Sequence, residues 1–192
     1  RAARRVAPQR DSRPGQSSAP HDGAKIVMCG IAGLLIAGRN TDLKVSELLL
    51  QAMSDRLIHR GPDGAGLWCS NAGEIGLAHR RLAILDLSEA GAQPMFAHCG
   101  RFAVVFNGEI YNHLDLRDAL ERDRGPIAWR GHSDTETLLE GISHWGLSET
   151  LMRSYGMFAL AVWDVETRTL SLARDRMGEK PLFLAQLGQK WA

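Results

Sequence analysis

Residues 28–37 read Met-Cys-Gly-Ile-Ala-Gly-Leu-Leu-Ile-Ala, a short apolar run that Gly38 closes. A run of this length and composition is typical of a buried β-strand and is too short to span a membrane. The cysteine at position 29 directly follows the first methionine of the chain. If translation starts at Met28 and that methionine is removed, Cys29 becomes the first residue and carries a thiol and a free α-amine on one carbon.

A free α-amine next to a thiol is a combination that supports nucleophilic catalysis. The unperturbed pKa of such an amine is ~7.7–8.0, so near neutral pH part of it is uncharged and accepts a proton. A thiolate is a strong nucleophile, and an N-terminal amine can activate it. The alternative is that Cys29 is a small buried residue that opens the strand, and the Met-Cys pair alone favours that interpretation.

Two further runs, residues 102–106 and 157–163, are apolar at every position. A strand with one face in water would alternate, so each of these two is expected to be covered on both faces, within a layered structure. Further strands are expected at 67–70, 75–86, 169–173 (forming a hairpin with 163–164) and 182–185, and helices at 43–58, 114–122 and 134–145, with loops or turns at 59–66 and 88–94. Strands in adjacent runs favour an α+β domain over a doubly wound parallel sheet.

The composition is that of an ordinary globular domain. The chain has 192 residues, of which 44% are apolar and 23% charged, which excludes a wholly disordered or collagen-like chain. A formal net charge of +1 gives no reason to expect a nucleic-acid partner. The three cysteines are widely spaced and odd in number, which argues against a disulfide framework and for a reducing compartment, the cytoplasm by default.

The first 27 residues differ from the rest of the chain. They carry six basic and two acidic side chains, a net charge of +4, against −3 for residues 28–192. They are rich in Pro, Ser and Gly and hold few large apolar residues, so we expect a disordered leader outside the working protein. A transit peptide or an autoprocessed propeptide is the alternative, although three prolines would break an amphipathic helix there.

Several common catalytic signatures are missing from the sequence. It contains no Gly-x-x-x-x-Gly-Lys loop, no Gly-x-Gly-x-x-Gly, no His-Glu-x-x-His and no Gly-x-Ser-x-Gly. The seven histidines show no metal-ligand spacing. Nucleotide binding and metal catalysis within this chain are therefore not expected.

Six short motifs follow one another along the chain. They are Met-Cys-Gly-Ile-Ala-Gly at 28–33, His-Arg-Gly-Pro-Asp at 59–63, Gly-Ala-Gln-Pro-Met at 91–95, Asn-Gly-Glu-Ile-Tyr-Asn-His at 107–113, Ser-Asp-Thr-Glu at 133–136 and Arg-Asp-Arg-Met-Gly-Glu-Lys-Pro-Leu at 174–182. In this order, residues 28–192 resemble the glutaminase domain of glutamine-hydrolysing asparagine synthetases, which are class II glutamine amidotransferases of the N-terminal nucleophile hydrolase type. The resemblance implies a four-layer αββα sandwich of two mainly antiparallel sheets.

The resemblance also implies roles for individual residues. Cys29 would be the nucleophile with its α-amine as base, and Asn107 and Gly108 would form the oxyanion hole. Arg81 would bind the α-carboxylate of glutamine and Asp134 its α-ammonium. The remaining residues expected to line the glutamine pocket are Leu82, Ala83, Ile84, Leu85 and Glu109.

Each of these patterns also has a purely structural interpretation. Asn107-Gly108 is a strong hairpin-turn pair, and the motif at 133–136 fits a helix capping box with Ser133 as N-cap. One arginine on a strand usually faces water, and we expect Arg80 to be the solvent-side neighbour of Arg81. The motifs at 59–63 and 174–182 are expected to be structural.

The function implied is hydrolysis of glutamine to glutamate and ammonia, with no cofactor in this chain. Ammonia would pass to a C-terminal synthetase domain that binds ATP and Mg²⁺ and adenylates aspartate, and we expect the chain to stop before that domain. An amidotransferase domain for another acceptor, such as a sugar or peptide, and a non-catalytic module are the alternatives. The resemblance leaves a homodimer open.

Overall fold

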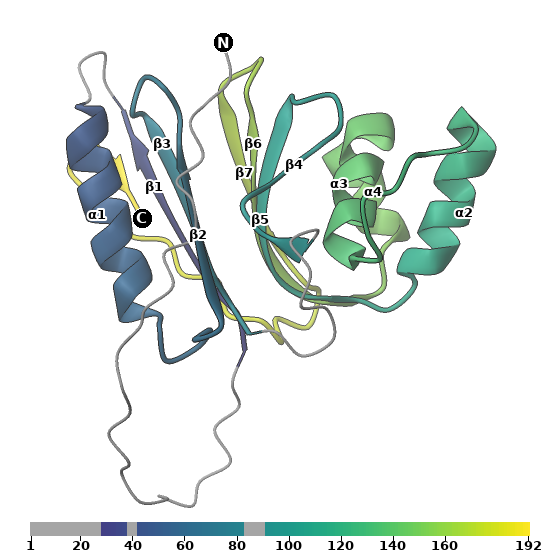
Figure 1. The fold of residues 1–192 in the computed structure, drawn as a ribbon, viewed down its shortest axis with the longest axis horizontal. Coiled ribbons are helices and arrows are strands. Elements are labelled where there is room, and N and C mark those ends of the chain that lie inside the picture. The colour runs from purple at the N-terminus through teal and green to yellow at the C-terminus, as the bar shows by residue number, and fades with distance from the viewer. Residues whose placement is uncertain (1–27, 38–41, 83–90) are drawn as a thin grey trace, which may run out of the picture.

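The computed structural model of the chain describes residues 28–37, 42–82 and 91–192. These residues form four layers, with one helix, two β-sheets face to face, and a layer of three helices (Figure 1). Neighbouring strands run antiparallel in both sheets. The α+β sandwich of αββα type is therefore confirmed. The expected leader lies outside the described residues.

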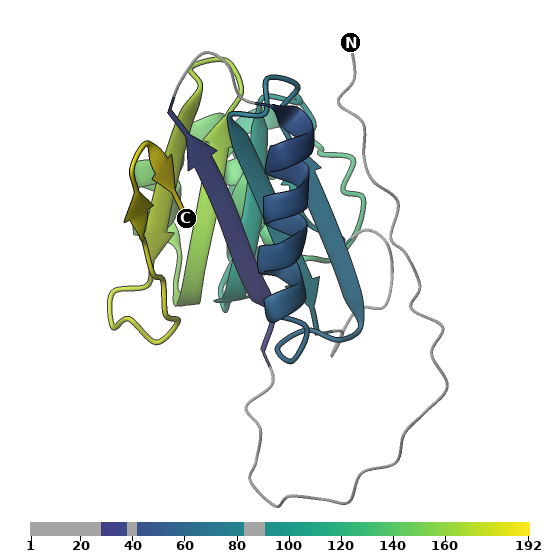
Figure 2. The ribbon, with the colours of Figure 1, turned by 90° about the vertical axis from the view of Figure 1, so that its left-hand side faces the viewer.

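The first sheet contains the strand that follows Cys29. In spatial order its strands are β2 (Gly64–Cys69), β3 (Ile75–Arg81), β1 (Gly30–Ile36), β9 (Lys190–Trp191) and β8 (Gln186–Leu187). Gly30 pairs with Arg80, so the beginning of β1 lies beside the end of β3. Helix α1 (Leu43–Arg56) lies across the outer face of this sheet (Figure 2).

The second sheet packs between the first sheet and the remaining helices. Its strands are, in spatial order, β4 (Met95–Phe96), β5 (Phe102–Ile110), β6 (Gly156–Asp164) and β7 (Thr169–Arg174). The helices beyond it are α2 (His113–Arg124), α3 (Asp134–Trp145) and α4 (Leu147–Arg153) (Figure 1). No helix in the described part of the chain is both long and apolar enough to cross a membrane.

Strand β5 contributes side chains to both apolar layers of the core. Val104 and Phe106 pack toward the helices with Leu138 and Leu139 of α3. Val105, on the opposite face, packs with residues of the first sheet in a second cluster. The expectation that residues 102–106 and 157–163 are covered on both faces is thus confirmed.

Helix α1 rests on the first sheet through a face of small residues around one leucine. Ser46, Leu50 and Ser54 are its buried residues, whereas the neighbouring Leu49 is 38% exposed. The approach is close because β3 has a glycine below the helix: a Cβ added at Gly76 would lie 3.0 Å from Leu50 Cδ2. The glycine in β3 thus allows the face of α1 that carries Ser46, Leu50 and Ser54 to pack on the sheet.

Replacing Leu50 with alanine is expected to lower the free energy of unfolding by about 2–5 kcal/mol, because it leaves a cavity under a side chain that is 0% exposed. The matched control is Leu48→Ala on the same helix, since Leu48 is 63% exposed. The control is expected to change the same quantity by no more than about 0.5 kcal/mol. Urea unfolding of the two variants measures both, and equal losses would contradict the packing described for α1.

Some expected elements differ from the structure. The interpretation of Asn107-Gly108 as a hairpin turn is wrong, because both residues lie inside β5 and pair with β6. The strand at 182–185 is also wrong: these residues line a cavity between the sheets, and β8 begins only at Gln186. The strand expected over 75–86 ends at Arg81. Residues 83–90 lie outside the described part, and the short elements β4 and α4 were not expected.

Candidate active site

The residues to which the resemblance points gather at one end of the sandwich. β1 begins there beside the end of β3, and Asp134 at the start of α3 accepts a hydrogen bond from the Ile110 amide at the end of β5. A cavity of about 820 Å³ lies at this end. Seven of the expected site residues line it: Cys29, Arg81, Leu82, Asn107, Gly108, Glu109 and Asp134. The other three, Ala83, Ile84 and Leu85, lie outside the described residues.

Cys29 is half-buried and stands directly before β1. The Leu82 amide donates to its Sγ at 3.4 Å, and the Leu82 carbonyl oxygen lies 3.9 Å from the same sulfur. Leu82 follows the last residue of β3, so the pairing of β1 with β3 determines the position of the sulfur. A fixed sulfur at the wall of a cavity has the placement that a nucleophile needs.

Arg81 faces the cavity because side chains alternate along β3. Its guanidinium packs against Gly91, where an added Cβ would lie 2.8 Å from Arg81 Nη2. The expectation that Arg80 faces solvent is wrong, since its side chain is 12% exposed and points to the opposite face of the strand. There its Nε donates to Ser54 Oγ at 2.9 Å and its guanidinium pairs with Asp55 of α1. Alternation thus directs one arginine to the helix and the other to the site.

The loop expected to be structural at 59–63 packs directly on this strand. A Cβ added at Gly61 would lie 2.4 Å from the Arg80 carbonyl oxygen. The Asp63 amide donates to the Arg81 carbonyl at 3.0 Å. Glycine allows the two backbones to meet, and the loop holds the end of β3 in place.

Asn107 and Gly108 follow one another at the wall of the cavity. Asn107 is 6% exposed and shares with Val105 the face of β5 that looks toward the first sheet. Gly108 packs closely on β6, since an added Cβ would lie 2.2 Å from the Met157 carbonyl oxygen. A neutral side-chain amide beside a glycine backbone is the kind of group that stabilises a developing oxyanion.

Asp134 is held at the N-terminus of α3. Its Oδ2 accepts from the Ile110 amide at 2.9 Å and its Oδ1 from the Thr135 amide at 2.8 Å. Burial raises the pKa of Asp134 above its usual value, and these two hydrogen bonds oppose the rise. Ser133 is the N-cap, as expected, and accepts from Thr135. Glu136, the last residue of the expected capping box, has a different role: its carboxylate accepts from the amides of Arg130 and Gly131 in the loop before α3.

Gln93 connects the two sides of the site. Its Oε1 accepts from the Phe106 amide at 2.6 Å, and its Nε2 donates to Thr135 Oγ1 at 3.4 Å. Phe106 precedes Asn107, and Thr135 follows Asp134, so one buried amide fixes the spacing between both groups. Sequence reasoning missed this residue, because nothing in the motif at 91–95 indicates partners in β5 and α3.

His79 also lines the cavity and was not expected there. It is 2% exposed, and alternation along β3 places it on the same face as Arg81, which is the signal that could have identified it. Burial lowers the pKa of His79 to about 4, and the charge of Arg81 acts in the same direction, against a hydrogen bond to the Phe106 backbone. The imidazole is therefore neutral at pH 7.

Because the unfolded chain protonates this histidine near pH 6.5 and the folded chain only near pH 4, the unfolded state binds more protons between these values. His79 is thus expected to remove about 3 kcal/mol of stability as the pH falls through that window. Urea unfolding at several pH values measures the loss. His79→Gln is expected to flatten this dependence, whereas His132→Gln, at an exposed position, is expected to keep it. If the free energy of unfolding depended on pH with the same slope in both variants, His79 would not be the group responsible.

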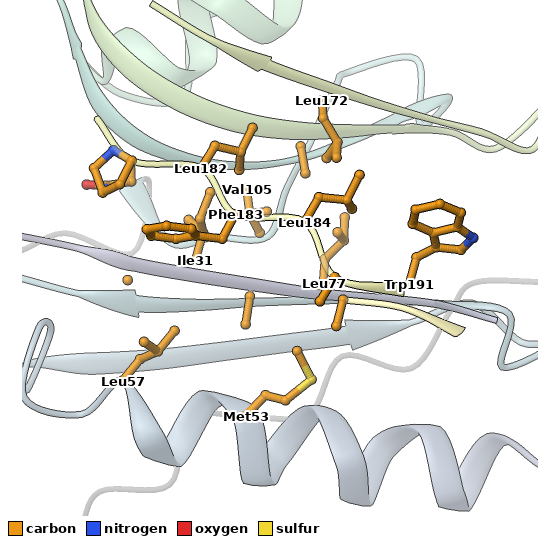
Figure 3. A pocket seen from close by; sticks show the side chains of 18 of the residues that line it. Ile31, Met53, Leu57, Leu77, Val105, Leu172, Leu182, Phe183, Leu184 and Trp191 are labelled. Carbon is orange, nitrogen blue, oxygen red and sulfur yellow. The ribbon is translucent and has the colours of Figure 1, made fainter. Parts of the chain in front are cut away.

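A second, apolar cavity of about 660 Å³ lies between the two sheets and shares Cys29 and Asn107 with the first. Figure 3 shows Met53 of α1 and Leu57, which directly follows that helix, on one side of it and Leu172 of β7 on the other. Residues 181–185 pass along this cavity and do not form the strand expected at 182–185, and Phe183 and Leu184 remain largely exposed. Cys29 therefore stands between a polar and an apolar cavity.

Comparisons with known proteins place these features in context. Residues 28–191 match a family model described as a glutamine amidotransferase domain. The chain is 44% identical over 134 residues to a putative glutamine-hydrolysing asparagine synthetase of Mycobacterium tuberculosis, covering 66% of this chain and 20% of that protein. It is 34% identical over 163 residues to glutamine-hydrolysing asparagine synthetase 1 of Bacillus subtilis, covering 85% of this chain and 25% of that protein. It thus spans a quarter or less of the length of these relatives.

A solved structure shares the fold. It is the glutamine phosphoribosylpyrophosphate amidotransferase of Bacillus subtilis in complex with ADP and GMP, with a TM-score of 0.61 and 17% sequence identity. The match covers 84% of this chain and 40% of the other. The likeness confirms the layered sandwich fold that the sequence predicts.

Proposed function

This chain belongs to the glutamine amidotransferase domain family, and from that premise we propose that its polar cavity hydrolyses glutamine to glutamate and ammonia. The observation that carries the proposal is that a cysteine, an asparagine followed by a glycine, an arginine and an aspartate line one cavity. They come from four separate parts of the chain. They are Cys29, Asn107, Gly108, Arg81 and Asp134.

The two charged groups suit the two ends of an amino acid. The planar guanidinium of Arg81 binds the α-carboxylate, for which its fork geometry is matched. Asp134 accepts from the α-ammonium. Because burial raises the pKa of this carboxyl group, a bound cation stabilises its charged form and gains correspondingly in binding. Glu109, which is exposed, flanks the same end.

The reaction uses the free N-terminus of a chain that begins at Cys29. The α-amine takes the thiol proton as the sulfur attacks the side-chain amide carbon, and Asn107 with Gly108 holds the oxyanion. The C–N bond then breaks, the proton passes to the leaving nitrogen, and ammonia departs from a thioester. Water adds to the thioester, releases glutamate and restores the thiol. Initiation at Met28 and removal of that methionine expose the amine that these steps require.

Ammonia has an apolar route away from the nucleophile, because the cavity between the sheets reaches Cys29 and Asn107. We propose that a synthetase domain of the intact protein receives it and, with ATP and Mg²⁺, converts aspartate to asparagine. The names of the relatives in Mycobacterium tuberculosis and Bacillus subtilis support this acceptor. ATP and Mg²⁺ belong to that domain and take no part in the glutamine half-reaction.

A glutaminase assay tests the proposal. A chain beginning at Cys29 is expected to release glutamate and ammonia from L-glutamine in equal amounts, and to leave D-glutamine and L-asparagine intact. The Cys29→Ser variant is the control for a contaminating activity and is expected to release neither. A folded chain with Cys29 at its N-terminus that forms no glutamate would overturn the proposal.

A further inference from the structure

Lys180 is a buried lysine that the steps above do not use. It is 6% exposed and lines the polar cavity together with Cys29. Among the described residues, no carboxylate forms an ion pair with its ammonium group, whose hydrogen-bond partner is the Met28 sulfur at 2.8 Å. A thioether is a weak acceptor, and lysine is rarely buried without a charged partner. Burying a charge without a charged partner lowers stability, so we expect the ammonium group of Lys180 to have a function in the cavity.

The position of Lys180 is fixed by its backbone. Asp175 Oδ2 accepts from the Lys180 amide at 3.0 Å, and the same carboxylate accepts from the amides of Glu179 and Phe158. The turn from β7 is therefore tied to β6, and the lysine side chain enters the cavity from a rigid support. The motif at 174–182, expected to be structural, thus also carries a charge to the site.

The partner of this ammonium is the residue that the proposed function removes. Met28 is joined to Cys29 by one peptide bond, so its loss deletes the weak acceptor and leaves the free amine of Cys29 in the same cavity. A neutral amine can accept a hydrogen bond from an ammonium group, whereas a protonated amine is repelled by it. Nearby positive charge is one of the ways in which an amine nucleophile or base is kept unprotonated.

We propose that Lys180 acts through Cys29, as a fixed positive charge that keeps the free α-amine unprotonated and ready to serve as the base. This inference rests on the proposed function. Other charged or titratable groups also face this region: Arg60 from the loop after α1, His79 and Arg81 from β3, Glu109 from β5, His113 from α2, Arg130, His132 and Asp134 near the start of α3, and Asp175 and Glu179 from the turn of Lys180. All of them remain when Lys180 alone is changed, so a comparison of variants isolates its effect.

The first experiment is the pH profile of kcat/KM for glutamine hydrolysis by chains that begin at Cys29. Lys180→Met removes the charge and keeps a similar side-chain volume. This variant is expected to shift the acidic limb of the profile upward by about one pH unit, which corresponds to a tenfold change in the neutral fraction of the amine. Lys180→Arg is expected to keep the limb in place. The control for net charge is Lys44→Met, at the exposed far end of α1, which is expected to shift nothing.

A second measurement does not depend on activity. In a Cys29→Ala background, which removes the competing thiol, the rate of trace acetylation of the N-terminal amine against pH gives the pKa of that amine. We expect this pKa to lie below the unperturbed ~7.7 with Lys180 present and to rise by about one unit in Lys180→Met.

The two measurements separate the two claims. If no variant hydrolyses glutamine, the proposed function fails, and the amine titration still decides the role of Lys180. If hydrolysis at the plateau pH is retained and neither the limb nor the amine pKa moves in Lys180→Met, the inference about Lys180 is wrong. Should Lys180→Met fail to fold, an amine pKa at or above the unperturbed value in the parent chain overturns the inference.

Discussion

A chain that keeps Met28 ahead of Cys29 is expected to hydrolyse glutamine about 10²–10⁴-fold more slowly than one that begins at Cys29, because a general base contributes a factor of that size. In the longer chain the nitrogen of Cys29 is an amide without basicity. Met28 also lines the cavity and contacts Lys180, so it occupies space beside the nucleophile. Two fusion proteins cut in vitro directly before residue 28 or directly before residue 29 give the matched pair, and ammonia release measures the difference.

Loss of activity in this pair is informative only if the thiol is intact. Titration of free thiols in the unfolded proteins is expected to give three per chain in both, for Cys29, Cys69 and Cys99. Equal kcat values for the two chains would remove the α-amine from the mechanism. They would leave the cysteine as a nucleophile activated by some other group.

Replacing Asn107 with alanine is expected to lower kcat for glutamine hydrolysis by ~10²–10³-fold and to leave KM nearly unchanged, because an oxyanion donor acts mainly in the transition state. Asn107 is buried in the middle of a paired strand, so thermal unfolding has to confirm that the variant is folded. Asn71→Ala, in an exposed turn, is the control that should change neither constant. A rise in KM at constant kcat would instead make Asn107 a group that binds ground-state glutamine.

Local patterns in the sequence predict most of the sandwich. Uninterrupted apolar runs identify strands covered on both faces, and β5 and β6 have that property because their sheet lies between the first sheet and the layer of helices. Helix α3 begins where Ser133 caps it. The hairpin interpretation of Asn107-Gly108 is wrong because propensity for a turn is local, whereas nine residue pairs join β5 to β6.

The site is only partly visible in the sequence. The resemblance points to Cys29 and Asp134, which stand in the motifs at 28–33 and 133–136, and to Arg81, which lies outside the six motifs. Gln93 and Lys180 also stand in two of the motifs, but their contacts could not be predicted from these motifs, because the partners lie 42 and 152 residues away. The side of α1 that packs on the sheet depends in the same way on a glycine in another strand. Long-range contacts of this kind have no signature in local spacing.

Covalent labelling shows whether Cys29 is the nucleophile of a glutamine site. A chain beginning at Cys29 is treated with a diazoketone analogue of glutamine, and peptide mass spectrometry locates the adduct. We expect one adduct per chain, on Cys29, and we expect excess L-glutamine to prevent it. Cys69, whose pKa burial raises to about 11, and the exposed Cys99 serve as internal controls and should remain unlabelled. An unlabelled Cys29, or labelling of Cys99 to the same extent with no protection by glutamine, would contradict a glutamine site at this nucleophile.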